Sequence, residues 1–406
     1  MADAVIVAAV RSPIGRAVKG SLRGMRADDM AAAMISAALA KVPALDPHTI
    51  DDIMLGCAQP AGEQGYGMAR VVAVMLGLDD VPGTVSQRYC ASSLQTTRMA
   101  LHAIRAGEAH ALVSAGAESV SHYDHGKSDG MPETKNPVFA PAMRASGERA
   151  VAGAAQWADP RDAGLLPDVY LAMGETAENV AAWKNVSRRR QDEFAARSQQ
   201  LAQAAIASGF VSVDITPVEL PDGSVVAADD GPRPNVTADS LAALKPVFRP
   251  GGTVTAGNCC PLNDGAAALI VMSDVRAAEL GVTPLARVVS TGVSAVSPEI
   301  MGLGPVEATR RALANARMSV DDMDLVEINE AFAAQVLPCV DELKIDPENV
   351  NVHGGAIALG HPFGQTGARL TTTLINGLRF REGQLGLVTM CAAGGQGMAM
   401  IFERLS

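Results

Sequence analysis

The chain has 406 residues, of which 48% are hydrophobic and 3% aromatic, and its formal net charge is -11 at pH 7. This charge argues against nucleic acid as a partner, and no apolar run approaches the roughly 20 residues of a membrane-spanning helix. The length exceeds what one compact core usually holds, so two domains or two halves are expected.

The cysteines and the start of the chain bear on metal binding and compartment. Six cysteines are scattered along the sequence without a CxxC pair or a ladder of His and Cys. We therefore expect reduced thiols rather than a zinc site. The first strand is predicted at Ala4–Ala9, almost at Met1, which leaves no room for a targeting segment. These observations predict a cytoplasmic protein with no bound metal ion.

Two stretches of the chain share a pattern of helix, acidic turn and short apolar strand. In the first, a helix around Met30–Ala40 leads to a strand at Ile50–Leu55. In the second, a helix around Ala308–Ala316 leads to a strand at Asp322–Ile328. The repetition favours a chain built from two related α/β halves.

The next elements of each half correspond as well. A helix that begins at Cys90 leads through a glycine turn to an apolar strand at Ala111–Gly116. The corresponding elements of the second half are a helix through Leu370 and Leu378 and a strand at Leu385–Met390. Near-continuous apolar strands that alternate with helices indicate mostly parallel sheets covered on both faces.

The sequence changes in character between the halves. Residues 121–168 are rich in Gly, Pro, Asp and Asn and are interpreted as an elaborate loop. A helical stretch is predicted from Glu175 to about Ser208, with Arg188–Arg190 near its middle. Long ordered loops tend to be functional, so this insertion is expected to cover a site formed by the halves. A surface loop without function is the alternative.

Cys90 lies where a strand is predicted to end and a helix to begin. Unpaired N–H groups and the positive end of the helix dipole favour a thiolate at such a junction. A small cysteine buried at a packed junction fits the same position. From spacing alone, a nucleophile and a core residue are equally good interpretations.

Three polar side chains of the second half lie in turns or just beyond strands. His361 stands in a Gly-His-Pro turn, where glycines let a ligand approach a proton carrier, although a lone His is more often a satisfied polar group. Cys391 ends an apolar strand before the loop Gly394–Gly397, which either faces an oxyanion or simply provides flexible backbone. Asn329 could hold a water or cap the following helix. Together with Cys90, these residues indicate covalent acyl chemistry.

Several segments resemble the motifs of the thiolase family, in the family's order and over the whole chain. They are Gln87–Ser93, Gly174–Asn179, Thr253–Asn258, Asn263–Ala267, Met301–Pro305, Asn329–Phe332, Gly354–Pro362 and Met390–Gly395. The resemblance implies an α/β fold with duplicated βαβαβαββ halves in a five-layered α/β/α/β/α arrangement. It places an N-terminal domain at 1–274, with an inserted loop domain at about 121–248, and a C-terminal domain at 281–406.

The resemblance also implies the chemistry. Thiolases exchange acyl groups between a 3-ketoacyl-CoA and CoA, or run the reverse condensation. Cys90 matches the acylated nucleophile, His361 its activating base and Cys391 the second acid and base. Asn329 matches the residue that holds a water in the first oxyanion hole, and the backbone N–H groups of Cys90 and Ala393 match the second.

For substrate binding, the resemblance implies three groups of contacts and no permanently bound cofactor, with coenzyme A as a substrate. Arg233 would contact the adenine end of CoA. The pantetheine would lie along Ala256, Cys260 and Leu262, and the acyl pocket would be walled by Met173, Met301 and Phe332. A homodimer or homotetramer is expected, with acyl-CoA substrates and neither nucleic acid nor a membrane as partner.

The chain departs from the family pattern at several positions. Cys260 stands where Ser is usual, and Ala91 and Ala393 stand where Gly is usual. Short-chain biosynthetic members often carry His where this chain has Ala172, which favours a 3-ketoacyl-CoA thiolase of fatty acid or sterol side-chain β-oxidation.

Three alternatives to that function follow from the same motifs. One is an acetoacetyl-CoA thiolase that works in condensation. A ketoacyl synthase would usually have His at position 329 and lack the cysteine at 391. A non-catalytic thiolase-like lipid-binding protein would be expected to lose Cys90, His361 or Cys391, and all three are present.

Overall fold

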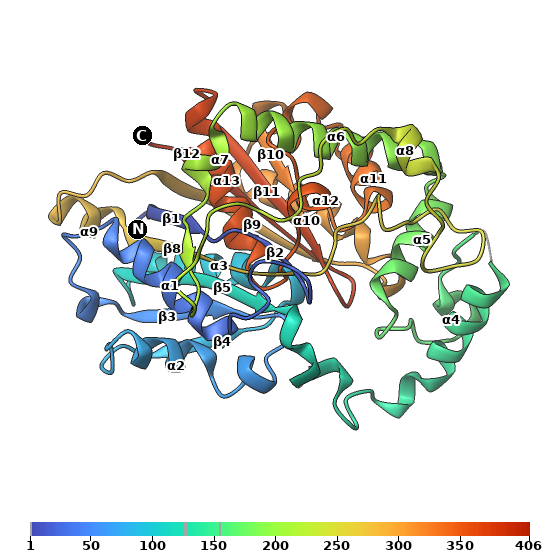
Figure 1. Ribbon diagram of the computed structural model, residues 1–406, viewed down its shortest axis with the longest axis horizontal. Coiled ribbons are helices and arrows are strands. Elements are labelled where there is room, and N and C mark those ends of the chain that lie inside the picture. Colours follow the sequence, from blue (N-terminus) through green and yellow to red (C-terminus); the bar gives the residue numbers. More distant parts are fainter. Residues whose placement is uncertain (1, 126–127, 154–155) are drawn as a thin grey trace.

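A sheet of ten strands runs through the computed structural model, which describes residues 2–125, 128–153 and 156–406 (Figure 1). Its N-terminal half contains β1 (Ala4–Arg11), β2 (Gly15–Arg16), β3 (Asp52–Gly56), β4 (Gly83–Ser86), β5 (Ala111–Ser119) and β8 (Asn263–Ser273). Its C-terminal half contains β9 (Ala286–Ala295), β10 (Leu325–Ile328), β11 (Leu385–Ala392) and β12 (Gln396–Arg404). The order is β10-β11-β12-β9-β1-β8-β5-β3-β4, with β2 beside β8.

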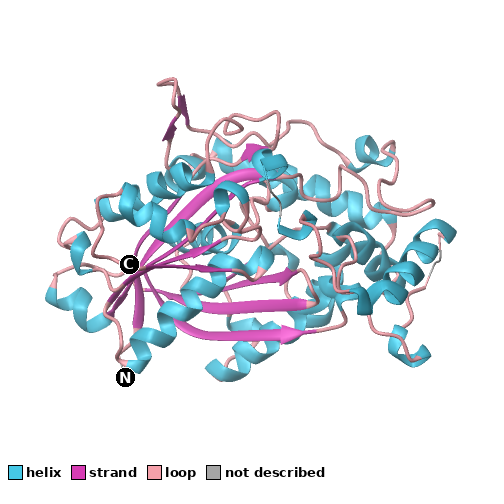
Figure 2. Cartoon of the chain, turned by 90° about the horizontal axis from the view of Figure 1, so that it is seen from below, coloured by secondary structure: helices cyan, strands magenta, loops and turns pink. Residues whose placement is uncertain are grey.

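Helices turn the two half-sheets into five layers. The outer face of the N-terminal half is covered by α1 (Ala27–Ala40) and α2 (Met68–Met75), and that of the C-terminal half by α10 (Gly304–Ala316) and α11 (Ala333–Leu343). Between the halves, α3 (Ser92–Ala106) and α13 (Thr366–Phe380) pack on each other. Figure 2 shows the half-sheets close together near the C-terminus and wide apart on the opposite side. The predicted α/β fold, with two related halves in five layers, is confirmed.

The half-sheets meet through a short contact of β1 and β9. Val5 is paired with Arg287, and Ile6 with Ala286. Strand β8 shows why these strands are apolar along their whole length, because alternate side chains enter different layers. Its outward residues join the core with α1 and its inward residues join the core with α3 and α13; they are Ala266, Ala268, Ile270 and Met272 outward, and Ala267, Leu269 and Val271 inward.

The prediction of mostly parallel sheets is wrong. Parallel pairs are β3–β4, β3–β5 and β10–β11, whereas β1–β8, β5–β8, β11–β12, β12–β9 and β1–β9 are antiparallel. Continuous apolar strands report burial of both faces, and helices bury both faces here whatever the strand direction. The apolar pattern therefore could not distinguish parallel from antiparallel sheets.

The segment between β5 and β8 holds the inserted elements. They are α4 (Ala140–Ala152), α5 (Met173–Trp183), α6 (Arg188–Ala207), α7 (Phe210–Asp214), α8 (Ala238–Ala242), β6 (Val218–Glu219) and β7 (Val225–Val226). The loop predicted over 121–168 thus contains α4, and its residues 126–127 and 154–155 lie outside the described residues. The remaining helices are α9 (Asp274–Glu279) and α12 (Ala356–Leu359).

The single helical stretch predicted from Glu175 to Ser208 is in fact two helices. Asn185 adopts a φ of 54°, which ends α5, and the side chain of Ser187 caps α6 by accepting from Arg190 N at 3.2 Å. The three arginines therefore lie at the start of α6 rather than in the middle of a helix. Across the described ranges, every helix is too short or too polar to cross a bilayer.

Candidate active site

The turn that carries Cys90 is tight and held by its own hydrogen bonds. It begins after β4 and ends where α3 starts, and Tyr89 within it has a φ of 45°. Ser92 Oγ accepts from Arg88 N at 2.9 Å and donates to Tyr89 O at 2.6 Å. Ala91 has a φ of -93°, so the usual glycine is not required there. The turn presents a cysteine whose exposed fraction is 8%.

Cys90 is a thiol in this structure rather than the thiolate that its place at a helix start suggested. Burial raises the pKa of Cys90 to about 12, and hydrogen bonds from the N–H groups of Cys90 and Ala393 counter part of this rise. The cost of burying a charge thus outweighs the helix terminus. The same two N–H groups face the sulfur, where a thioester oxygen would also lie.

Ala393 can occupy this position because two glycines adopt the left-handed backbone conformations of its loop. The left-handed φ values of 77° and 80° fall on Gly394 and Gly395. Gln396 fixes the loop, since its Nε2 donates to Ala393 O at 3.1 Å and its Oε1 accepts from Arg88 at 2.8 Å. An alanine at 393 is therefore compatible with the loop.

A cavity of about 410 Å³ opens onto Cys90. Ala393, Met173 and Leu262, three residues that the sequence had singled out, lie on its wall. Tyr123 and residues 169–172 of the inserted segment line it too. The insertion thus covers the Cys90 site, as the sequence predicted.

His361 is held in a defined orientation. Its N–H donates to Asn263 Oδ1 at 2.9 Å. Its ring Nδ1 lies 2.6 Å from Thr366 Oγ1, whose own proton is directed to Pro362 O at 2.7 Å. The hydrogen-bond pattern therefore places the ring proton on Nδ1 and leaves the lone pair on Nε2, which faces Asn329 Nδ2 at 3.2 Å.

The imidazole of His361 is neutral. Burial, together with the positive charge of Arg369, lowers the pKa of His361 to about 3. A neutral imidazole with an available Nε2 can accept a proton from a nucleophile. Asn329 Oδ1 beside it is buried and has no hydrogen-bond partner among the described residues.

Cys391 lies in an apolar cluster and does not line the Cys90 cavity. It is fully buried in one cluster with Met301 and Phe332, against which Met173 packs. Burial raises the pKa of Cys391 well above its usual range, as for Cys90. Cys391 is therefore a thiol able to donate a proton, placed among three of the predicted acyl-pocket residues.

Cys260 also belongs to this neighbourhood. Its N–H donates to Ala331 O at 3.0 Å, which ties its segment to the loop that follows Asn329. Burial raises the pKa of Cys260 well above its usual range, and Cys259, Cys90 and Cys391 lie close enough to raise it further when they are ionised. The structure thus brings a third thiol near the two predicted reactive ones.

Two predicted CoA contacts lie away from the Cys90 cavity. Arg233 lines a separate cavity of about 320 Å³ with residues of α6, and its backbone N–H donates to Gln199 at 2.7 Å. Ala256 is exposed and lines neither cavity. Arg16 is close enough to Arg233 that their mutual repulsion, after burial, lowers the pKa of Arg233.

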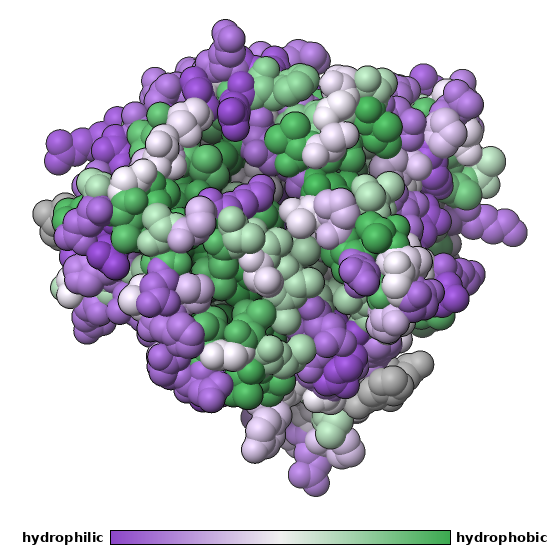
Figure 3. Space-filling model, turned by 60° about the vertical axis from the view of Figure 1, so that its left-hand side comes forward, coloured by the Kyte–Doolittle hydropathy of each residue, from purple (hydrophilic) through white to green (hydrophobic). Residues whose placement is uncertain are grey.

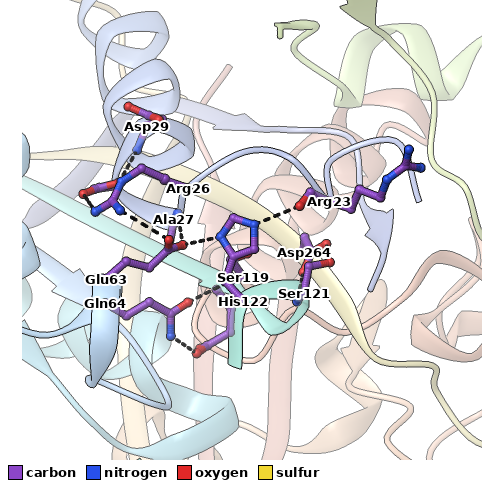
Figure 4. Close-up of polar contacts among 12 residues, drawn as sticks. Arg23, Arg26, Ala27, Asp29, Glu63, Gln64, Ser119, Ser121, His122 and Asp264 are labelled. Atoms are coloured by element: carbon purple, nitrogen blue, oxygen red, sulfur yellow. Dashed lines mark hydrogen bonds and ion pairs between the residues drawn. The ribbon is translucent and has the colours of Figure 1, made fainter. Parts of the chain in front are cut away.

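Sequence reasoning did not assign the residues that position His361, nor the separate set that anchors the start of the inserted segment. Thr366 orients His361 from the first turn of α13, and Asn263 holds its backbone. A second set anchors the inserted segment, where His122 lies between Glu63 at 2.8 Å and Arg23 O at 2.9 Å (Figure 4). A hydroxyl residue five positions after His361 was visible in the sequence, whereas the anchor joins segments far apart in the chain.

The low pKa of His361 predicts a pH-dependent stability. Between about pH 3 and 6.5, His361 is protonated in the unfolded chain and neutral in the folded protein. The free energy of unfolding should therefore fall as pH falls through this range. The variant His361→Gln should lose this part of the slope, up to about 1.4 kcal/mol per pH unit. Urea denaturation at a series of pH values measures how the free energy of unfolding of the parent and of His361→Gln changes with pH.

A second buried histidine provides the control for that measurement. Burial lowers the pKa of His353 to about 4, so His353→Gln should also flatten the slope, and it serves as the positive control. Equal slopes in the parent and in His361→Gln would contradict the neutral state of His361.

The comparisons with known proteins agree with this geometry. Residues 4–275 match the thiolase N-terminal domain and residues 282–404 the thiolase C-terminal domain. The chain is 42% identical over 415 residues to a protein of Photobacterium profundum named 3-ketoacyl-CoA thiolase, with 100% of both chains covered.

Solved structures are similar over the whole length. The dimeric peroxisomal thiolase of Saccharomyces cerevisiae is 34% identical with a TM-score of 0.85, covering 99% of this chain and 97% of its own. Human mitochondrial 3-ketoacyl-CoA thiolase in complex with CoA is 34% identical with a TM-score of 0.85, covering 99% and 98%. With both family domains and full-length relatives matched, the chain belongs to the thiolase family.

Proposed function

We propose that this acyltransferase is a cytoplasmic 3-ketoacyl-CoA thiolase of β-oxidation, which uses CoA to cleave a 3-ketoacyl-CoA into acetyl-CoA and a shortened acyl-CoA. The observation that carries the proposal is the environment of Cys90: a buried thiol on a cavity, with the N–H groups of Cys90 and Ala393 directed at its sulfur. The six free thiols support a reducing compartment.

In the first half-reaction, His361 takes the thiol proton of Cys90, and the sulfur attacks the ketone carbon of the substrate. The bond between that carbon and the neighbouring CH₂ breaks, and its electron pair leaves with acetyl-CoA as an enolate. Cys391 returns a proton to the enolate carbon. The neutral imidazole of His361 and the protonated Cys391 support these roles.

Two oxyanions form along this path, and each has candidate donors. Asn329, whose Oδ1 is buried without a partner in the described part of the chain, is suited to hold a water beside His361 for the enolate oxygen. The N–H groups of Cys90 and Ala393 are suited to the oxygen of the acyl group bound to Cys90.

In the second half-reaction, a new CoA thiol attacks the acyl group on Cys90. Cys391, now a thiolate, takes the proton of that thiol. The bond between Cys90 and the acyl carbon then breaks, and His361 returns its proton to the Cys90 sulfur. Splitting one transfer into two through a thioester gives ping-pong kinetics.

A path for CoA links the remaining predicted contacts. Arg233 lies near Arg16, which pairs with Asn263 between β2 and β8. Leu262, which directly precedes Asn263 in the chain, lies on the Cys90 cavity. Two arginines at the outer end suit the phosphates of CoA, and Leu262 at the inner end suits the pantetheine.

A thiolysis assay across 3-ketoacyl-CoA lengths tests the function. We expect faster cleavage of chains longer than C4, because the small side chain of Ala172, rather than an imidazole, lines the cavity of about 410 Å³. The variant Cys90→Ser should lose at least about a thousandfold in kcat while CoA still binds. Near-normal turnover of this variant would remove the nucleophile assignment, and a strict preference for C4 would favour acetoacetyl-CoA thiolase.

The variant Cys391→Ala tests the second role. Thiolysis should slow by about a hundredfold or more, because no group deprotonates the incoming thiol. The acyl group should then accumulate on Cys90, where intact-protein and peptide mass spectrometry detect it. Cys339→Ala removes an equally buried thiol of α11 and should leave turnover and the acyl-enzyme level unchanged. The absence of any Cys90 adduct in both proteins would contradict the assignment.

We also propose that the enzyme is a homodimer or homotetramer. Strand β4 ends the order of the sheet, and α2 packs beside it with Val74 and Met75 exposed. Apolar patches cross one face of the molecule between polar side chains (Figure 3). Light scattering after size exclusion should give at least twice the mass of one chain, and a single-chain mass at micromolar concentration would contradict the proposal.

A further inference from the structure

Glu118, at the end of β5, is a fully buried carboxylate surrounded by donors. Its Oε2 accepts from Ala58 N at 2.8 Å and Gly364 N at 2.9 Å. Its Oε1 accepts from Gln64 Nε2 at 2.7 Å and from Tyr123 OH at 2.9 Å. It is absent from the sequence motifs that indicated the function.

The groups that Glu118 holds come from three separate walls of the Cys90 cavity. Ala58 belongs to the loop after β3, Tyr123 to the inserted segment, and Gly364 follows Phe363 in the His361 loop; all but Gly364 are on the cavity wall. Gly364 is itself confined, because a Cβ there would lie 2.5 Å from Ala117 O. One carboxylate therefore ties the C-terminal half, which carries His361, to the N-terminal half, which carries Cys90.

Burial raises the pKa of Glu118, and the hydrogen bonds that it accepts oppose this rise by favouring the ionised form. Each partner donates, so a proton on either oxygen would face a donor. Among the described residues no Lys or Arg forms an ion pair with it. The negative charge is thus balanced by hydrogen bonds alone, and it raises the pKa values of Cys90 and Tyr123 beyond the effect of burial.

We propose that Glu118 is a positioning residue for the proposed thiolase reaction. Its carboxylate fixes the loop that carries His361 against the walls of the Cys90 cavity, and its charge helps to keep Cys90 a thiol until His361 takes the proton. The inference rests on the proposed function for its kinetic consequence and on the structure alone for its effect on Cys90.

The variant Glu118→Gln is the principal test, since it removes the charge and turns an NH₂ group toward donors. We expect kcat to fall by up to about a hundredfold, as a small displacement of a catalytic group costs that much. The KM for CoA should be unchanged, because Arg233 and Leu262 are untouched. Alkylation of Cys90 by iodoacetamide, followed by peptide mass spectrometry, should shift to lower pH.

The variant Glu118→Asp separates geometry from charge. It keeps the charge but withdraws the oxygens by one methylene, so kcat should fall while the pH profile of Cys90 alkylation stays that of the parent. It also replaces Glu118→Gln if that variant does not fold. Parental kcat in Glu118→Asp would overturn the positioning role.

Glu63→Gln is the matched control. Glu63 also accepts from several donors, among them Ala27 N and His122, and anchors the inserted segment without touching the His361 loop (Figure 4). It should lower stability and leave both the kcat and the alkylation profile unchanged. The proposal would be overturned if Glu63→Gln changed kcat and the alkylation profile as Glu118→Gln does. It would also be overturned if folded Glu118→Gln kept the parental kcat and alkylation profile.

The alkylation experiment keeps this test distinct from that of the function. If the parent cleaves no 3-ketoacyl-CoA, the proposed function fails, and the shift in Cys90 alkylation still decides whether Glu118 controls the thiol.

Discussion

The close packing of α3 on α13 is the contact on which the site depends. Cys90 lies directly before α3, and His361 lies in the turn before α13. The helices approach so closely that a Cβ at Gly367 would lie 2.2 Å from Leu94 N, and Ala368 N donates to Ser93 Oγ at 2.9 Å. The two helix starts are therefore held side by side, and each carries one residue of the proposed nucleophile and base pair.

Burial of the site sets the charge state of every reactive group. It keeps Cys90 and Cys391 as thiols and His361 as a neutral imidazole. A resting state without charges costs little to bury, and the charges of the reaction form only when substrate oxygens meet donors that are already oriented. Glu118 is the exception, because it stays ionised beneath the cavity and is balanced by hydrogen bonds from three cavity walls.

The inserted segment completes the cavity and is attached to both halves. Its start is anchored to the N-terminal half, where Ser121 N donates to Asp264 at 2.8 Å. Farther along, Arg149, Trp157 and the backbone of Asp168 donate to buried Glu299, next to the cluster of Met301. The residues after Asp168 line the cavity, so these attachments determine the shape of the Cys90 cavity.

The sequence by itself determined the duplicated α/β organisation and the identity of Cys90, His361, Cys391 and Asn329 as candidates. These are local signals, since apolar strands, helix starts and glycine turns are properties of neighbouring residues. Strand direction could not be predicted from the sequence, because a pattern of buried residues does not depend on direction. The break between α5 and α6 was also not predicted, because a helix break can depend on one left-handed residue. The tertiary structure decided which candidates share a cavity, which protons they hold, and that Glu118 joins the two halves. Those facts depend on contacts between residues far apart in the chain, such as Glu118 and Gly364, which are separated by 246 positions, and periodicity cannot reveal them.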